Sequence, residues 1–154
     1  LSEASGLLLS SVSAGNWYPV EPGVIVPTQA LCDMFYTDKK QGAWESGRYS
    51  AKMGLTGIYK VFVLISSPAF LLKRAARVIA TFYEPTDLRV ADSTDKSMTI
   101  QFTKLPVKNE LIEYRIAGWM EMALEICGCK NLQVNISQSM ARGNSIFETK
   151  INWE

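Results

Sequence analysis

Two cysteines separated by one residue are the most reactive-looking local feature of this sequence. Cys127 and Cys129 flank Gly128, and together with Cys32 they could supply three thiolates to a metal ion or form a redox pair. A common zinc site needs two Cys-x-x-Cys pairs, whereas this chain has one shorter pair. Because free cysteine is often buried, we favour a structural interpretation: Cys127 in the core, Cys129 in a turn, and no metal site.

The sequence contains no histidine, which removes much of the usual chemistry of protein sites. A Ser-His-Asp or Cys-His nucleophile cannot be assembled, and neither a histidine-bearing zinc site nor a histidine-ligated heme is available. The chain also lacks a GxGxxG or Walker phosphate-binding pattern. Chemistry that uses only carboxylate, Lys, Tyr or Cys side chains stays open. We nevertheless predict that the chain is not an enzyme and has no cofactor.

Two clusters of charge fall on predicted helices. Glu121 and Glu125 lie one helical turn apart and could bind a cation, but a solvated helix face is the simpler interpretation. Lys73, Arg74 and Arg77 form a basic strip that could hold a phosphate or an acidic partner. Because no glycine-rich phosphate cradle accompanies the strip, we again favour a solvated face.

Arg115 has a more specific position, one helical turn before Trp119 at the edge of an apolar stripe. A guanidinium placed there can anchor the head group of an anionic ligand inside an apolar pocket. The alternatives are a surface arginine that extends its charge into water and an interior ion pair. The sequence does not choose between these interpretations.

The amino-acid composition limits which binding partners and which cellular compartment we expect. The chain has 154 residues, 47% hydrophobic and 20% charged, which is ordinary for a folded domain. Sixteen basic and fifteen acidic residues leave a net charge of +1, so we predict no nucleic-acid partner. No segment reaches the roughly 20 apolar residues that span a bilayer, so we predict no transmembrane segment. Three cysteines, an odd set, suit a reducing compartment, and we expect a cytoplasmic protein.

The first half of the chain has the apolar period of helices. Pro27 suits the first turn of one helix, and Ser67 followed by Pro68 is a strong start signal for another. We expect a turn-rich segment at 15–23 and a polar loop at 37–42. The predicted helices cover residues 2–12, 28–36, 43–53, 54–65 and 67–83. The segment 54–65 is apolar almost all round and could also be a buried strand, but we favour a helix.

The second half changes to the period of strands. Apolar residues alternate with polar ones over 88–103 and again over 132–153, and each stretch contains a turn, which predicts two hairpins with one buried face each. Between them, residues 109–127 form an amphipathic helix, with Gly128 at its C-terminal end. The predicted fold class is α+β, with N-terminal helices packed on an antiparallel four-stranded sheet. We expect one domain over 1–154, comprising a helical part (1–85) and a ββαββ part (86–154).

Several short strings, taken in order from about residue 15 to the end, resemble a known group of proteins. They are Trp17-Tyr18-Pro19, Gly47-Arg48-Tyr49-Ser50-Ala51, Gly57-Ile58-Tyr59-Lys60-Val61-Phe62, Ser67-Pro68, Gly118-Trp119 and the closing Trp153. In this order they resemble an uncharacterised bacterial family of small helical–ββαββ proteins. That family is similar in turn to the heme-dependent nitric-oxide-sensing, 4-vinyl reductase and TRAPP-type transport domains.

The resemblance implies helices packed against an antiparallel sheet with a ligand or lipid held between them, in a sensor or adaptor. This sequence departs from the heme sensors because it has no histidine for the iron and no Tyr-x-Ser-x-Arg string for the heme propionates. Histidine-ligated heme binding is therefore not carried over. We expect an apolar or anionic small-molecule ligand, bound by Tyr59, Phe62, Arg115 and Trp119.

Three functions compete. The first is a non-catalytic cytoplasmic sensory or small-molecule- or lipid-binding domain with a pocket between the helices and the sheet. The second is a protein-interaction or scaffold domain, a homodimer that uses exposed strand edges or helix faces. The third is a small enzyme that uses Cys, Arg or Tyr, which would gain support from an unusually reactive thiol. We favour the first.

Overall fold

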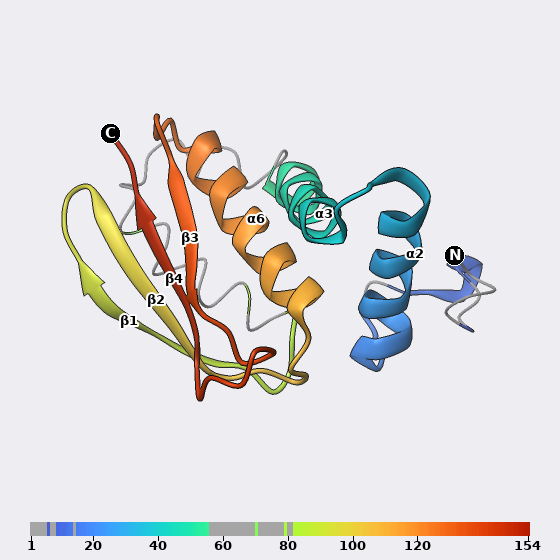
Figure 1. Cartoon of the computed structure of the whole chain (residues 1–154). Coiled ribbons are helices and arrows are strands. Elements are labelled where there is room, and N and C mark those ends of the chain that lie inside the picture. Colours follow the sequence, from blue (N-terminus) through green and yellow to red (C-terminus); the bar gives the residue numbers. More distant parts are fainter. Residues whose placement is uncertain (1–5, 7–8, 14, 56–69, 71–78, 80–81) are drawn as a thin grey trace.

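The computed structural model of the chain describes residues 6, 9–13, 15–55, 70, 79 and 82–154. In chain order the elements are the 3-10 helix η1 (Leu9–Ser11), the π-helix η2 (Glu21–Ile25), α2 (Val26–Phe35), α3 (Lys39–Leu55), β1 (Asp87–Ser93), β2 (Ser97–Lys104), α6 (Glu110–Ile126), β3 (Gln133–Gln138) and β4 (Phe147–Asn152). In Figure 1, α6 lies against one face of the sheet, α3 lies beyond α6, and α2 is farther still from the sheet.

The sheet has four strands in the order β1-β2-β4-β3, and every neighbouring pair is antiparallel. The two hairpins therefore meet through β2 and β4, and α6 is the connection that lets the second hairpin lie beside the first. This arrangement confirms the predicted α+β class with a four-stranded antiparallel sheet and a C-terminal ββαββ order.

The core lies between the sheet and α6. Residues at alternate strand positions, such as Met98, Ile100 and Phe102 on β2, are at most 1% exposed, as expected for a sheet with one buried face. The Phe102 and Phe147 rings of paired strands lie 5.0 Å apart. The helix contributes Ile112, Ile116, Met120 and Leu124 to the same cluster.

Both ends of α6 follow signals that are visible in the sequence. The Asn109 side chain accepts hydrogen bonds from the backbone N–H groups of Leu111 and Ile112, which satisfies two donors at the N-terminus. At the other end Gly128 has φ +89°, and its N–H bonds the Glu125 carbonyl. The next N–H, that of Cys129, bonds the Leu124 carbonyl and completes a Schellman motif.

Helices α3 and α6 cross at two glycines. A Cβ on Gly47 would collide with the Arg115 carbonyl, and one on Gly118 would collide with the Trp44 carbonyl. The two backbones therefore touch directly at the crossing, which no other residue type would allow.

An ion cluster lies beside this crossing. Arg48 on α3 pairs with Glu121 and Glu125 on α6 and with Glu45 on its own helix. The Trp44 indole N–H also donates to Glu121, at 2.7 Å. The interpretation as a solvated face holds for Glu125, which is exposed, but not for Glu121, which is half-buried because α3 packs against α6. Arg48 of the protein itself is the cation that both carboxylates bind.

Three local differences from the sequence predictions have identifiable causes. Helix α3 begins at Lys39 inside the predicted loop, because Asp38 caps it by accepting from the Lys40 N–H at 2.8 Å. The end of the predicted turn-rich segment overlaps η2, a π-helix that begins at Glu21, with Pro22 in its first turn. Glu148, on the predicted polar face of β4, is 6% exposed because Gln101 and Ser137 donate to it from the flanking strands.

Several predictions fall wholly or largely outside the described residues. These are the helices over 2–12, 54–65 and 67–83 and the basic strip of Lys73, Arg74 and Arg77. Of the described residues in the predicted range 67–83, Phe70 and Ile79 are helical, whereas Tyr83 lies in a bend. Among the helices that the structure describes, none is both long and apolar enough to cross a membrane.

Candidate ligand-binding cavity

A cavity of about 440 Å³ lies between α3, α6 and the residues Ile79, Phe82 and Tyr83. That volume falls within the range of small-molecule sites. Most of its described lining is apolar, and only three of the lining side chains carry polar groups at their ends. The lining residues are Val24, Ser50, Gly54, Leu55, Ile79, Phe82, Tyr83, Arg115, Ile116 and Trp119.

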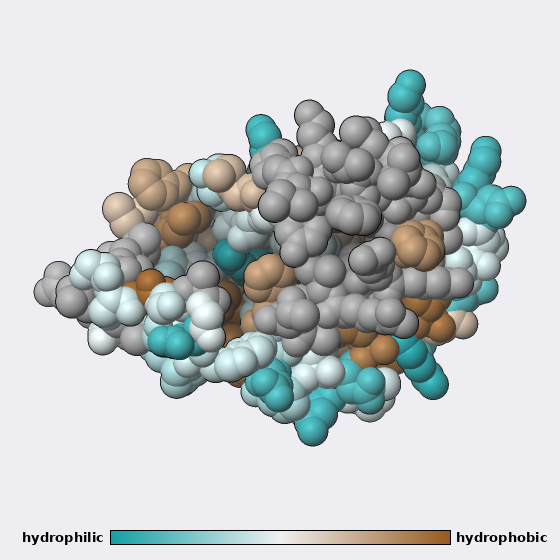
Figure 2. Space-filling model, turned by 180° about the vertical axis from the view of Figure 1, so that it is seen from behind, coloured by the Kyte–Doolittle hydropathy of each residue, from teal (hydrophilic) through white to brown (hydrophobic). Residues whose placement is uncertain are grey.

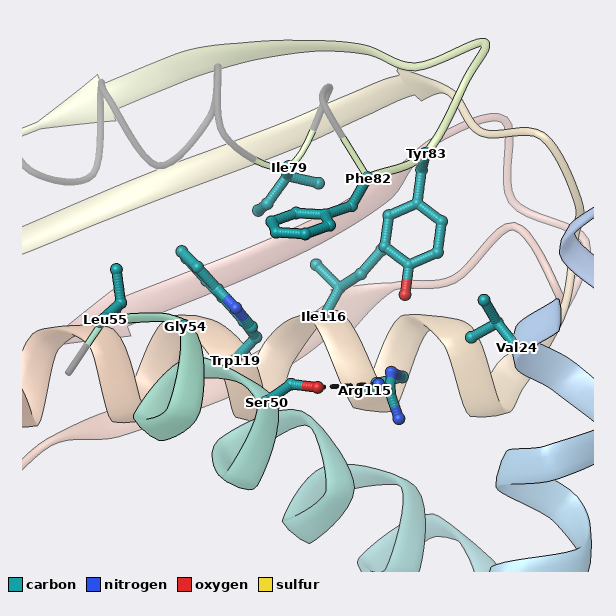
Figure 3. A pocket seen from close by; sticks show the side chains of 10 residues that line it. All are labelled: Val24, Ser50, Gly54, Leu55, Ile79, Phe82, Tyr83, Arg115, Ile116 and Trp119. Carbon is teal, nitrogen blue, oxygen red and sulfur yellow. Dashed lines mark hydrogen bonds between the residues drawn. The ribbon is translucent and has the colours of Figure 1, made fainter. Parts of the chain in front are cut away.

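The polar groups gather at one end of this cavity. Figure 3 shows Arg115 hydrogen-bonded to Ser50, with the Tyr83 hydroxyl directed toward the same end. Leu55 and Trp119 line the opposite end. The cavity therefore has an apolar chamber and one charged end, as sites for small molecules with a single polar group have.

Hydroxyl groups on two helices hold the Arg115 guanidinium in place. It donates to the Ser50 hydroxyl at 2.8 Å and to the Ser46 hydroxyl at 2.9 Å, both on α3. A longer hydrogen bond of 3.5 Å reaches the buried Thr28 hydroxyl on α2. Ser46 in turn donates to the Ala43 carbonyl at 2.8 Å, which orients its oxygen toward the arginine.

Tyr83 completes the charged end. Burial raises the pKa of its phenol, and the charge of the adjacent Arg115 opposes part of that rise. The phenol is therefore protonated at neutral pH and available as a neutral hydrogen-bonding group beside the guanidinium.

The three thiols lie outside the described lining of the cavity. Burial raises the pKa of the Cys127 thiol to about 12, and Cys129 adds to that rise. Burial also raises the pKa values of Cys129 and Cys32. Cys129 does lie in the turn after α6, but it is the buried member of the pair, whereas Cys127 at the C-cap is half-buried. Within the described residues no three metal-ligand side chains come together.

These raised pKa values predict slow alkylation. Iodoacetamide should modify Cys127 at pH 7.5 at least about tenfold more slowly in the folded protein than in urea, because the thiolate is the reactive form. Mass spectrometry of peptides after timed labelling would give the rate at each cysteine, and the rate should rise steeply as the pH approaches the raised pKa. Fast labelling of any thiol at neutral pH would contradict this prediction and support the hypothesis of an enzyme with a reactive cysteine.

Two of the four residues expected to bind a ligand, Arg115 and Trp119, line the cavity, and the other two, Tyr59 and Phe62, lie outside the described residues. Whether Arg115 and Trp119 contact a ligand stays a prediction. Sequence reasoning did not select Ser50 or Tyr83 as site residues. Ser50 lies within one of the strings that carry the family resemblance. Nothing in the sequence predicts its hydrogen bond with Arg115, which is 65 positions away.

The resemblance to heme sensors raises the question of whether this cavity fits a heme. Heme iron is held by His, Cys, Met or Tyr. Of the described lining residues only Tyr83 belongs to that set, and burial favours its neutral phenol over the phenolate that would bind iron. The sequence has no histidine. The described side chains that line the cavity therefore do not fit an iron-ligated heme.

Comparison with known proteins identifies the fold. No protein-family model matches the sequence, and no curated protein matches it. Among solved structures, an H-NOX protein from S. oneidensis in the Fe(II)NO state superposes with a TM-score of 0.72 at 11% identity, covering 96% of this chain and 83% of that one. A variant H-NOX protein from K. algicida gives 0.68 at 13% identity, covering 99% and 85%. At these identities the likeness establishes the architecture, and the chain has the heme-NO-binding fold.

Proposed function

We propose that this chain is a non-catalytic, cytoplasmic sensory domain that binds a small, largely apolar molecule without histidine-ligated heme. The observation that carries the proposal is the cavity between α3, α6 and Tyr83, with its apolar chamber and single charged end. Its likeness in fold to H-NOX proteins supports a ligand-holding role.

The walls of the cavity suit a sensor. Trp119 and Arg115 stand on α6, which also forms one side of the core, while Ser50 and Leu55 stand on α3. Because both helices are joined at a direct backbone crossing, a ligand that touches both would bias their relative position. Binding would then be communicated to the sheet through α6.

A neutral apolar probe tests this function. N-phenyl-1-naphthylamine should gain fluorescence on titration into the purified protein, because an apolar site excludes water from the dye. The W119L variant should bind it at least about tenfold more weakly, since it loses an aromatic wall of the cavity. The W17L variant is the matched control, because Trp17 is 61% exposed and does not line the cavity.

Native mass spectrometry of the same preparation would detect a molecule that co-purifies with the protein. A folded protein that neither retains such a molecule nor binds the probe would contradict the proposed function. Equal weakening by W119L and W17L would show that the probe binds elsewhere.

An interaction domain is the second candidate, favoured by large exposed apolar side chains. Met34 and Phe35 at the end of α2 are 68% and 71% exposed, and Tyr49 on α3 is 66% exposed. Figure 2 shows apolar residues, in brown, among hydrophilic ones on the face turned away in Figure 1. Light scattering across a dilution series would measure the molar mass and so distinguish the two candidates. A stable dimer supports the interaction domain, and a strict monomer opposes it.

A further inference from the structure

Arg115 brings a positive charge to the cavity that no described carboxylate neutralises. Among the described residues its hydrogen-bond partners are neutral: the hydroxyls of Thr28, Ser46 and Ser50, and the Tyr83 phenol. Among the described residues none of the ion pairs includes it. The stretch 56–81, which separates α3 from the bend at Tyr83, contains no Asp or Glu. A half-buried charge without a counter-charge is unusual, because burial favours pairing.

Arg48 provides an internal contrast. It lies in the same α3–α6 interface, yet it contacts the carboxylates of Glu45, Glu121 and Glu125. Glu125 and Glu121 raise its pKa. An arginine whose role is to join the two helices is therefore neutralised in this fold. Among the described residues, Arg115 instead receives hydroxyl acceptors, which orient the guanidinium and bring no negative charge to it.

The geometry of these groups also limits where a counter-charge can come from. Ser46 and Ser50 hold Arg115 from the α3 side, and Tyr83 stands over it at the wall of the cavity. An anion that reaches the guanidinium through the cavity would have its remaining atoms among Ile116, Trp119 and the apolar lining. A guanidinium forms strong charge-assisted hydrogen bonds with a carboxylate, even through an N–H group left over by Ser46, Ser50 and Thr28.

We infer that the cavity selects an apolar or aromatic monocarboxylate, with its carboxylate on Arg115 and its apolar body against Trp119. This assignment rests on the proposed function and deepens it. One guanidinium balances one negative charge, and the described lining holds no second cation that a phosphate dianion would need. Tyr83, neutral and protonated, can donate to the same carboxylate.

Calorimetric titration with matched probes tests the inference. We expect wild-type protein to bind 1-naphthoate at least about tenfold more tightly than 1-naphthamide, which has the same shape and no charge. In R115Q this preference should vanish while binding of the amide persists. R115K should keep part of the preference, because it retains the charge without the planar fork. R89Q is the matched control, since Arg89 lies on β1 outside the cavity lining and bonds Gln101.

The outcomes separate this inference from the proposed function. If acid and amide bind equally well to wild type, the inference is overturned and the proposed function stands. If neither binds, both fail. Tighter binding of 1-naphthyl phosphate than of 1-naphthoate would overturn the assignment to a carboxylate. Thermal unfolding would establish whether R115Q is folded. If it is not, R115K provides the test: a preference for 1-naphthoate as strong as in the wild type would contradict the inference, and a reduced one would support it.

Discussion

Replacing Gly118 with alanine should lower the free energy of unfolding by about 3 kcal/mol, the upper end of the usual cost of overpacking. A Cβ at this position would overlap the Trp44 carbonyl oxygen and crowd the Trp44 Cα, 3.0 Å away. These are backbone atoms of a helix, so they cannot rotate aside as a side chain would. The helices must separate, which also moves Arg115 on α6 away from Ser50 on α3.

Urea unfolding followed by circular dichroism would measure this loss, and G47A should behave similarly because its Cβ would meet the Arg115 carbonyl. The matched control is G54A on the same helix as Gly47. A Cβ there meets nothing within 4 Å, so stability should be unchanged or raised by roughly 0.5 to 1 kcal/mol. If G118A were as stable as G54A, the direct backbone crossing would be wrong.

Replacing Glu113 with alanine should cost about 3 kcal/mol, because it leaves buried donors without an acceptor. The Glu113 carboxylate is fully buried on α6 and accepts from the Ser139 hydroxyl and from the Ala141 N–H at 3.1 Å. It therefore ties the helix that carries Arg115 to the turn between β3 and β4. E113Q retains an acceptor oxygen of the same shape and should lose less stability than E113A.

The control for this measurement is E110A, one turn earlier on α6. Glu110 forms an ion pair with the exposed Lys40 at 3.0 Å, and such surface pairs contribute little to stability. A double-mutant cycle with S139A should show that the Glu113 and Ser139 losses are not additive. Additive losses, or equal effects of E113A and E110A, would contradict the assigned role of Glu113.

Much of the fold could be predicted because its signals are local. Apolar residues at every second position of β2 and β4 predicted the buried face of the sheet, and the structure confirms it. Gly128 predicted the C-terminal end of α6, and the structure adds Asn109, the first residue of the predicted helix, as its N-cap. In the segment before α3 the cap at Asp38 was overlooked, and so the start of that helix was placed too late.

The candidate site was only partly predictable. Arg115 and Trp119 drew attention because they share one helix, where spacing alone brings them together. Ser50 and Tyr83 line the same cavity from other segments. The periodicity of apolar residues does not predict which distant segments come into contact. The same limit applies to Arg48, whose partners Glu121 and Glu125 were interpreted as solvent-exposed.

By itself, then, the sequence determined the α+β class, the alternation that buries one face of the sheet, and the absence of every histidine-dependent chemistry. Only the tertiary structure decided that Gly47 and Gly118 let α3 and α6 touch, that Arg48 is neutralised, and that Arg115 is left with hydroxyls at the charged end of a cavity. The physical reason is distance along the chain. Caps and periodicity act between neighbours, whereas a cavity and its uncompensated charge are made by segments that only packing brings together.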